Sequence, residues 1–250
     1  MQDYPRISII VAVKNAEADI ENTILSIQKQ IYPNWEFIVI DSESEDDTPL
    51  IIERYWNVIT HYKCEPDSGI YEAWNKGLGM ATGEWVLFLG AGDELTERAL
   101  EEYVRFINNS PIKYDFVSSK VNLITSQNII KKTWGEPWQW NRFKVSMRIA
   151  HVGSLHHKSL FEKFGLFNTS YKIAGDYEFL LRPGTSLKAG FLDKITGSMK
   201  LGGVSLTNNM VYLESIRAKN ETGGRFKFYC ILDAMKLFLI VKLKNLFSIA

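Results

Sequence analysis

Four short runs of apolar and β-branched residues predict buried strands in the first half of the chain. The predicted strands are Ile7–Val13, Phe37–Ile40, Val58–Tyr62 and Trp85–Leu89. Continuous apolar runs of this length are typical of parallel strands that are covered on both faces. Turn-forming residues separate the runs from polar stretches of helical length, which favours an alternation of strands and helices.

Helices are predicted between these strands, because apolar residues recur there every three or four positions. One stripe consists of Ile20, Ile24, Ile27 and Ile31, and a later one of Leu100, Tyr103, Val104 and Ile107. Thr48, followed by Pro49, and Thr96 are suited to cap the starts of two helices. A further helix is expected over Ile70–Met80. The pattern predicts an α/β fold with a mostly parallel, open sheet flanked by helices.

The pattern is less regular after residue 110. Tyr114–Ile124 and Asn128–Lys132 predict a pair of strands, and Ser154–Phe164 and Asp176–Leu181 predict segments that contain helices. No repeat, low-complexity tract or linker divides the chain. We therefore expect one domain over residues 1–224, followed by a C-terminal helical segment over residues 225–250.

Composition narrows the class of protein. The chain has 250 residues, of which 46% are hydrophobic and 23% charged, which is ordinary for a globular domain. Its 29 Lys and Arg residues balance 29 Asp and Glu residues, so no nucleic-acid partner is expected. Cys64 and Cys230 lack metal-ligand spacing and are expected to be reduced thiols. The N-terminus does not resemble a signal peptide, and no long apolar window predicts a membrane span, so we expect a cytoplasmic location.

The segment Glu65–Asp93, with the sequence EPDSGIYEAWNKGLGMATGEWVLFLGAGD, contains the strongest functional pattern. It ends with a carboxylate just beyond a buried strand, where open α/β sheets bind their ligands. Together with VAVKNAEADI at Val11–Ile20 and IDSESEDDT at Ile40–Thr48, it resembles the donor half of family-2 glycosyltransferases with a GT-A fold. The resemblance is strong over residues 1–95 and moderate over Ile149–Arg182. It implies a donor half at residues 1–110 and an acceptor half at residues 111–224.

The resemblance implies contacts to the nucleotide sugar from the ends of the first two strands and from the loop before the third helix. The implied residues are Val11, Ala12, Val13, Asn15, Asp41, Asp67, Gly69, Asn75 and Lys76. Asp41 is expected to contact the base. Gly69 also suits a simple turn, and Lys76 also suits a solvated helix position. Ser68 stands where the family often has lysine, and Glu72 where it has aspartate.

The loop Gly90–Asp93 corresponds to the family's metal-binding loop, which commonly presents two or three carboxylates. This chain keeps Asp93, with Glu94 beside it. One carboxylate and the oxygens of a diphosphate are enough to hold Mg²⁺ or Mn²⁺, so a divalent metal is expected. The alternative is that Asp93 only caps the turn.

Asp176 occupies the position of the family's catalytic base in SYKIAGDYEFLLR, and Glu178 is the alternative base. Asp176 also stands at an expected helix start, where it is suited to capping. His151 matches a histidine common in the family and is a candidate for acceptor binding. His156 and His157 point to opposite faces if they lie in a strand, so a metal site made of this pair is not expected.

Trp134, Trp138 and Trp140 are candidates for an acceptor platform, because aromatic rings pack well against sugar rings. A small hydrophobic core is the alternative for these three residues. The motif Gly202–Ser205, GGVS, also recurs in the family and predicts a tight loop closing over the site.

The C-terminal segment is basic and apolar. Its charged residues are Arg225, Lys227, Lys236, Lys242 and Lys244, against the single acid Asp233. Apolar residues lie on or beside one helical face at Ile231, Leu232, Met235, Phe238, Leu239, Leu243 and Leu246. This composition suits a helix in an anionic membrane interface, and equally a helix docked on the domain.

These patterns together predict an inverting glycosyltransferase that uses a nucleotide sugar, with UDP as the expected carrier. The acceptor is expected to be a glycan or a lipid-linked molecule in surface-polysaccharide synthesis, and the working place the inner face of the plasma membrane. Two alternatives are a nucleotidyltransferase and a non-catalytic module that binds nucleotides or carbohydrates. A nucleotidyltransferase is expected to carry a glycine-rich basic loop after the first strand, where this chain offers only Lys14. The presence of both Asp93 and Asp176 disfavours the non-catalytic module.

Overall fold

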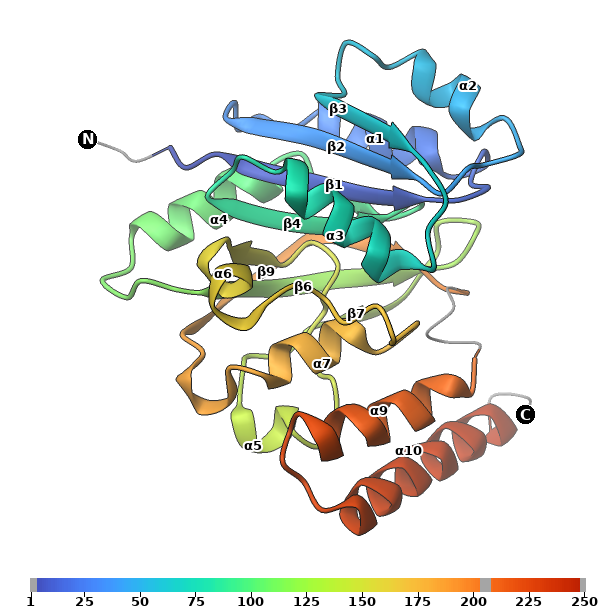
Figure 1. Ribbon diagram of the computed structural model, residues 1–250, viewed down its shortest axis with the longest axis vertical. Helices are drawn as coiled ribbons and strands as arrows, with labels where there is room; N and C mark the ends of the chain where they lie inside the picture. The colour runs from blue at the N-terminus through green and yellow to red at the C-terminus, as the bar shows by residue number, and fades with distance from the viewer. Residues whose placement is uncertain (1–3, 203–207, 248–250) are drawn as a thin grey trace.

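The computed structural model describes residues 4–202 and 208–247, and the side chains of Leu237 and of residues 239–247 lie outside the description. Within these residues a nine-stranded sheet forms the centre of the molecule, with strand order β3-β2-β1-β4-β8-β6-β9-β5 and with β7 paired to β6 (Figure 1). The strands are β1 Ile7–Val13, β2 Trp35–Asp41, β3 His61–Cys64, β4 Trp85–Gly90, β5 Glu94–Leu95, β6 Phe116–Ile124, β7 Ile130–Trp134, β8 Leu155–His157 and β9 Ala189–Lys200.

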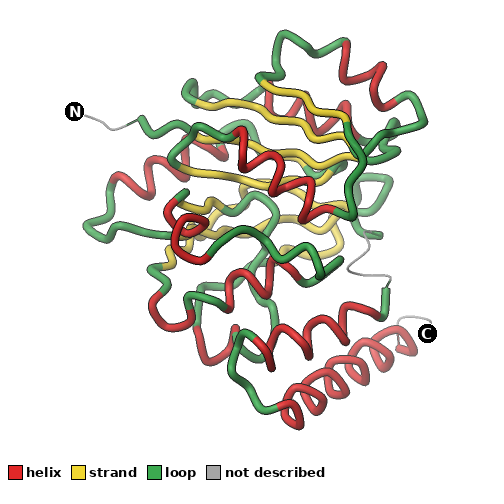
Figure 2. Tube along the Cα trace, in the orientation of Figure 1, coloured by secondary structure: helices red, strands yellow, loops and turns green. Residues whose placement is uncertain are grey.

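The helices connect and cover these strands (Figure 2). They are α1 Ile20–Gln28, α2 Thr48–Glu53, α3 Ile70–Met80, α4 Ala99–Asn108, α5 Trp140–Phe143, α6 Ser159–Phe164, α7 Gly175–Leu181, α9 Met210–Glu221 and α10 Lys227–Phe247, with a 3₁₀ turn at Gly184–Ser186. The neighbours β3, β2, β1 and β4 are mutually parallel, as are β6 and β9, and β8 runs antiparallel between β4 and β6. The predicted mostly parallel α/β sheet is confirmed.

Both faces of the sheet are buried, which explains the continuous apolar runs in the sequence. Along β1, Ile7 and Ile9 pack with α1 and α4 on one face, whereas Ile10 packs with α3 on the other. The helix α3 lies so close to β1 that a Cβ atom at Gly77 would stand 2.5 Å from Cγ2 of Ile10. Glycine at this position therefore permits the close packing of α3 on the sheet.

Two boundaries in the first half differ from the predictions. The strand predicted at Val58–Tyr62 begins only at His61, because Val58 and Ile59 are buried in a turn closed by hydrogen bonds to the carbonyl of Tyr55. Helix α4 begins at Ala99, since Thr96 instead pairs with the carbonyl of Thr196.

Two further details of the prediction are corrected. Ile31 lies beyond the end of α1 and is exposed, so it does not extend the apolar stripe. Thr48 is the first residue of α2, but its hydroxyl accepts the backbone N–H of Ala16 in a neighbouring loop rather than capping its own helix. The predicted strand pair after residue 110 is confirmed as β6 and β7, with β7 beginning two residues later than expected.

The helices α9 and α10 pack against each other as a hairpin, and α9 packs on α7 at the lower end of the molecule in Figure 1. Cys230 and Ala234 form the buried side of α10. In the described part of the chain no helix has the length and apolarity needed to cross a membrane. Of the predicted Gly202–Ser205 loop, residues 203–205 lie outside the described residues.

Candidate active site

Three of the predicted site residues mark the carboxyl ends of β1, β2 and β4: Asn15 follows β1, Asp41 is the last residue of β2, and Asp93 follows β4. The register of the sheet places Val13 beside Asp41 and Ala12 beside Gly90, so these three strands end at one edge. Ligands of open α/β sheets bind at this edge. The starts of α3 and α7 are joined to each other through side chains, as described below.

Asp41 is fully buried at the end of β2 and holds the loop that follows. Its Oδ1 accepts hydrogen bonds from the N–H and the hydroxyl of Ser44, at 2.9 and 2.7 Å. Its Oδ2 accepts the hydroxyl of Tyr62 at 3.0 Å. Burial and the charge of Asp41 raise the pKa of Tyr62, so this phenol stays protonated and remains a donor.

Asn15 connects the loop after β1 with the loop after β2. It has a positive φ of 47°, a conformation that asparagine tolerates better than most residues. Its Oδ1 accepts the N–H of Glu45, and its own N–H donates to the hydroxyl of Ser44, both at 2.9 Å. In β1, Val11 and Val13 are buried and Ala12 is half-buried. The structure therefore brings Val11, Ala12, Val13, Asn15 and Asp41 together.

The acidic loop before α3 is held by its own side chains. Gly69 adopts a φ of 137°, a conformation that favours glycine, and donates its N–H to Oδ1 of Asp67 at 2.9 Å. Lys76 donates to the carbonyl of Pro66 at 2.6 Å and pairs with Glu65 and Glu72 at 3.1 and 3.4 Å. Asp67 and Lys76 thus stabilise the loop in this structure.

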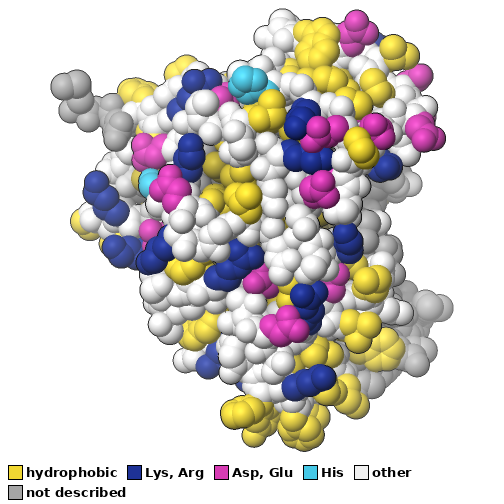
Figure 3. Space-filling model, viewed as in Figure 1, with side chains coloured by type: hydrophobic (Ala, Val, Ile, Leu, Met, Phe, Trp, Pro, Cys, Tyr) yellow, Lys and Arg dark blue, Asp and Glu magenta, His cyan; other side chains and the backbone are white. Residues whose placement is uncertain are grey.

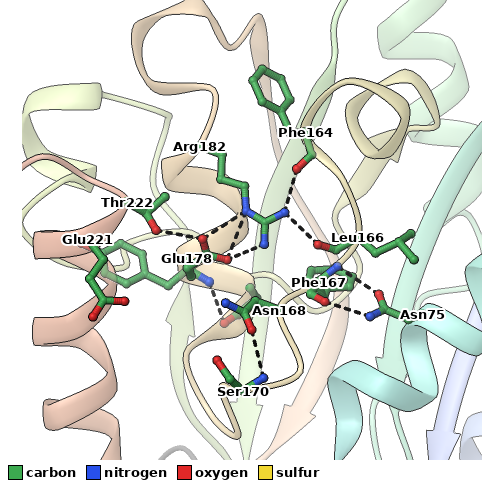
Figure 4. A network of polar contacts seen from close by, with 12 residues as sticks. Asn75, Phe164, Leu166, Phe167, Asn168, Ser170, Glu178, Arg182, Glu221 and Thr222 are labelled. Carbon is green, nitrogen blue, oxygen red and sulfur yellow. Dashed lines mark hydrogen bonds and ion pairs between the residues drawn. The ribbon is translucent and has the colours of Figure 1, made fainter.

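Asn75 links α3 to the acceptor half rather than facing open space. Its Nδ2 donates to the carbonyl of Phe167 at 2.8 Å, and its Oδ1 accepts the N–H of the same residue at 3.0 Å (Figure 4). Both polar ends of the amide are therefore occupied. Its expected role in binding the donor stays a prediction.

Asp93 lies 8% exposed at the end of the turn after β4, and its Oδ2 accepts the N–H of Gly90 at 2.8 Å. Burial raises the pKa of its carboxyl group to about 7, and within the described residues no cationic side chain pairs with it. A buried acid without a countercharge suits a cation, so Asp93 fits a metal ligand as well as a turn cap. No group of three His, Cys, Asp or Glu side chains that suits a metal exists within residues 4–202 and 208–247.

Asp176 is the second residue of α7 and is half-buried. Its Oδ1 accepts the N–H of Tyr177 at 2.8 Å and lies 3.1 Å from the hydroxyl of Tyr71 on α3. No hydrogen bond to Oδ2 from a described residue is present. One carboxylate oxygen is thus fixed by the protein, and the other has no partner among the described residues.

His151 is buried, and its ring packs against those of Trp74 and Phe88, with centroids 5.3 and 5.9 Å away. Burial lowers its pKa, and the charge of Asp176 opposes this shift. Its Nε2 has no hydrogen-bond partner among the described residues. As predicted, His156 and His157 diverge in β8, since His156 is fully buried and His157 reaches Ser159 and Glu84 at the edge.

Two comparisons of the sequence with known proteins decide the family. The family model described as "Glycosyl transferase family 2" matches residues 8–163, which is more than half of the chain. The chain belongs to glycosyl transferase family 2. A "PGL/p-HBAD biosynthesis glycosyltransferase" of Mycobacterium tuberculosis is 28% identical over 218 residues, which cover 81% of this chain and 80% of that protein.

Other relatives of this family-2 glycosyltransferase cover less of either chain or share less sequence. A "Putative teichuronic acid biosynthesis glycosyltransferase TuaG" of Bacillus subtilis is 33% identical over 115 residues, 45% of this chain and 46% of TuaG. The crystal structure of S. aureus TarS 1-349 in complex with UDP-GlcNAc has a TM-score of 0.71 at 21% identity, covering 86% of this chain and 65% of that one. A mannosyltransferase of Pyrobaculum calidifontis, in complex with GDP-Man and Mn²⁺, has a TM-score of 0.62 at 18% identity, covering 96% and 75%. The GT-A fold is thereby confirmed.

Glu178, the second candidate for the base in the sequence, forms an ion pair with Arg182. Its carboxylate binds Arg182 through Nη2 at 2.6 Å and through Nε at 3.1 and 3.2 Å, and accepts the hydroxyl of Thr222 at 2.8 Å (Figure 4). Arg182 also donates to the carbonyls of Phe164 and Leu166. Glu178 is 5% exposed, so it acts as a structural junction of α7 with α9 and is a poor candidate for a base.

The three tryptophans do not form one platform. Trp138 packs on Phe143 with centroids 4.3 Å apart and lies 6.3 Å from Trp140, so these rings extend the hydrophobic core. Trp140 also approaches Gly184, beyond the C-terminal end of α7, whereas Asp176 lies at the other end. Trp134 is at the end of β7 under the ammonium group of Lys132. An acceptor role for these rings stays a prediction.

Two residues near Asp176 were assigned no role from the sequence. Glu214, on α9, accepts three backbone N–H groups just before Asp176. Lys172 donates its ammonium group to the carbonyl of Ser68, in the loop before α3. The sequence shows no motif around Glu214. Lys172 and Ser68 are 104 residues apart, so no local pattern predicts their contact.

Proposed function

We propose that this glycosyltransferase transfers a sugar from a UDP-linked donor, with inversion, to a glycan or lipid-linked acceptor in bacterial surface-polysaccharide synthesis. Relatives named for PGL/p-HBAD and teichuronic acid biosynthesis, and a fold shared with TarS bound to UDP-GlcNAc, support the proposal. The observation that carries it is the half-buried carboxylate of Asp176 at the start of α7, with one oxygen held and one left without a partner among the described residues.

The proposed reaction is a single displacement. Oδ2 of Asp176 takes the proton from an acceptor hydroxyl, while the oxygen of that hydroxyl bonds to the anomeric carbon of the donor sugar. The bond from that carbon to the diphosphate breaks on the opposite side, and the electron pair leaves with UDP. Burial favours the neutral form of His151, and its Nε2 is buried without a partner among the described residues, so its predicted contact with the acceptor requires the site to open there.

The proposed nucleoside site lies between the loops after β1 and β2. Backbone groups of Val11, Ala12 and Val13, with Asn15, line it. Asp41 is fully buried and shapes the loop through Ser44 and Tyr62, so its predicted contact with the base requires it to become accessible. Each carboxylate oxygen has two lone pairs, so Oδ2 of Asp41 retains acceptor capacity beyond the bond from Tyr62.

The proposed diphosphate site lies between Asp93 and the loop at Asp67–Gly69. Asp93 would hold Mg²⁺ or Mn²⁺, which neutralises charge on the leaving diphosphate when bound. Lys172 places a positive charge beside Ser68, where the family often has lysine in the loop itself. Asn75 and Lys76 would act here through the shape of the loop.

We also propose that the α9–α10 hairpin holds the enzyme at the inner face of the plasma membrane. Exposed apolar side chains gather on it, at the lower end of the view in Figure 3. The exposed residues are Phe226, Phe228, Tyr229, Ile231, Leu232, Met235 and Phe238. Lys227 and Lys236 are exposed beside them, and this mixture suits an anionic interface.

A screen of nucleotide sugars tests the reaction. Each donor is tested for protection against thermal unfolding, with and without Mn²⁺, and for release of UDP in the presence of the protein. We expect UDP-linked sugars to protect and at least one to be turned over. Release of pyrophosphate from a nucleoside triphosphate and a sugar phosphate would instead identify a nucleotidyltransferase, and protection without turnover by any acceptor would identify a binding module.

A further inference from the structure

The loop that precedes Asp176 is held from two sides by buried side chains. On one side, Glu214 of α9 accepts the backbone N–H groups of Lys172 at 2.8 Å, and of Ile173 and Ala174 at 2.8 and 2.9 Å. Glu214 is 7% exposed, and hydrogen bonds to a carboxylate are about twice as strong as those between neutral groups. Three successive backbone groups are thereby fixed immediately before the base.

On the other side, the hydroxyl of Tyr71 lies 2.6 Å from the carbonyl of Ile173 and 3.1 Å from Oδ1 of Asp176. A Cβ atom at Gly175 would stand 2.7 Å from the Tyr71 ring, so the ring lies directly against the start of α7. Burial raises the pKa of Tyr71 well above its usual value, and the hydroxyl therefore keeps its proton.

The position of this hydroxyl suits both protonation states of the base. A tyrosine hydroxyl can donate one hydrogen bond and accept others. While Asp176 is a carboxylate, the hydroxyl is within reach as a donor. Once Oδ2 of Asp176 has taken a proton, Oδ1 is the carbonyl oxygen of a carboxylic acid and still accepts hydrogen bonds, so Tyr71 can donate to it or to the carbonyl of Ile173. The same oxygen therefore has a partner before and after proton transfer.

We propose that Tyr71 and Glu214 are positioning residues for Asp176, a pair that we call the base clamp. The inference rests on the proposed function, because it assumes that Asp176 is the base. Placing a base to within a fraction of an ångström matters greatly for proton transfer, and a misplacement of 1 Å can cost about 100-fold in rate. The clamp also connects the base to α9, which is the first helix of the hairpin proposed to bind the membrane.

Isosteric substitutions test the base clamp in the full-length chain. Tyr71→Phe removes one hydroxyl and keeps the packed ring. Glu214→Gln replaces one acceptor oxygen by an NH₂ group that faces a backbone donor. We expect each substitution to lower kcat for UDP release about 10- to 100-fold, while the KM for the donor changes less than about threefold.

Two matched control variants remove similar groups far from the base. Tyr103→Phe removes a buried tyrosine hydroxyl that contacts Thr196, and Glu36→Gln alters a buried carboxylate that accepts the N–H groups of Thr82 and Gly83 near the amino ends of β1 and β4. Their melting temperatures report how much stability such changes remove. At temperatures where all variants are folded, these controls are expected to keep kcat near the wild-type value.

A double-mutant cycle with Asp176→Asn separates positioning from a general structural effect. If the clamp acts through the base, adding Tyr71→Phe or Glu214→Gln to Asp176→Asn has little further effect on the rate. Equal fold-losses in both backgrounds, or wild-type kcat in the clamp variants, would overturn the inference and leave the base assignment intact. Full activity of Asp176→Asn itself, or release of UDP from no donor by the wild type, overturns the proposed function and the clamp with it.

Discussion

Asn75 and the backbone of Phe167 form a reciprocal pair of hydrogen bonds, at 2.8 and 3.0 Å, between the donor and acceptor halves of the chain. A residue of the motif predicted to bind the nucleotide sugar thus holds the segment that leads to Asp176, the proposed base. The ring of Phe167 packs on Trp74 and Phe88, so the same contact fixes part of the aromatic wall beside His151. These contacts join α3 to the segment that precedes α7.

Asn75→Ala is expected to lower the free energy of unfolding by about 2–3 kcal/mol, because two buried backbone groups lose their partners. Denaturant unfolding measures this, and Asn109→Ala, at an exposed position after α4, serves as control. Unchanged affinity for UDP in the folded variant would assign Asn75 to structure alone. A loss of affinity without loss of stability would restore its predicted contact with the donor.

Asp176→Asn is expected to reduce the rate of transfer by a factor on the order of 100 or more, because the amide cannot accept the proton. UDP affinity, measured by calorimetry, is expected to stay within about threefold. Glu178→Gln provides the contrast, since it weakens the buried pair with Arg182 and is expected to lower stability by roughly 3 kcal/mol. An active Asp176→Asn variant beside an inactive but stable Glu178→Gln variant would exchange the two roles.

The sequence predicted the sheet better than the roles of its polar residues, for a physical reason. Burial on both faces produces the apolar runs of β1, β2 and β4, and these were placed nearly correctly. Val58 and Ile59 misled the prediction of β3 because a buried turn has the same composition as a buried strand. Periodicity shows which residues are buried but not which secondary structure buries them.

The motifs in the sequence located the candidate site, but they did not predict the hydrogen bonds that connect its residues. Motifs placed Asp41 at the end of β2 and Asp93 after β4, two strands whose carboxyl ends the sheet brings together, and Asp176 at the start of α7. The contact of Tyr71 with Asp176 joins residues 105 positions apart, and that of Glu214 with Ala174 uses backbone donors that no sequence pattern displays. Such contacts depend on how α3, α7 and α9 pack, which local sequence does not specify.

The stability of the protein is expected to depend on the ionisation of Asp93. Its pKa is about 7 in the folded chain and about 4 when unfolded, so the folded state binds the proton more tightly. The contribution of Asp93 to stability is then largest below about pH 4, falls as pH rises to about 7, and changes little above that. The total change is on the order of a few kcal/mol. Asp93→Asn should therefore melt at a higher temperature than the wild type at pH 8, with the difference closing at pH 4.

The control for this measurement is Glu53→Gln, which neutralises an exposed acid at the end of α2. Its melting temperature relative to the wild type is expected to change little between pH 4 and pH 8. If Asp93→Asn and Glu53→Gln show the same dependence on pH, burial does not disfavour the charge of Asp93, and the argument for an unpaired buried acid fails.

Asp93 is also the proposed metal ligand, so removal of a divalent metal is expected to weaken donor binding. Chelation with EDTA should lower the affinity of the wild type for a UDP-sugar by about tenfold or more, and Mn²⁺ should restore it. In Asp93→Asn the response to Mn²⁺ should largely disappear, while affinity for uridine, which has no phosphate, should be unchanged. Turnover that is insensitive to chelator in the wild type, together with an active Asp93→Asn variant, would reduce Asp93 to a turn cap.

The last prediction concerns the α9–α10 hairpin, whose two sides have different neighbours. Cys230 and Ala234 pack inward, and Arg225 pairs with Asp233 at 2.8 Å, so this arginine is less available to lipid than its sequence position suggests. Leu232 and Met235 are 45% and 56% exposed. The hairpin is therefore docked on the domain through one side and presents apolar residues on the other.

Truncation of α10 would uncover its docked side, so surface substitutions test membrane binding more cleanly. The double variant Leu232→Ser, Met235→Ser is expected to lose most of its binding to vesicles that contain anionic lipid, because inserted apolar area supplies much of the affinity. Lys227→Gln with Lys236→Gln should weaken binding at low salt, where each basic residue contributes up to roughly 1 kcal/mol, and matter less as salt screens the charges. Leu50→Ser with Ile112→Ser, at exposed positions on α2 and after α4, is the matched control and should bind as the wild type does. Co-sedimentation with vesicles measures all four proteins, and a wild type that remains in the supernatant at low salt would show that the hairpin is only a structural helix pair.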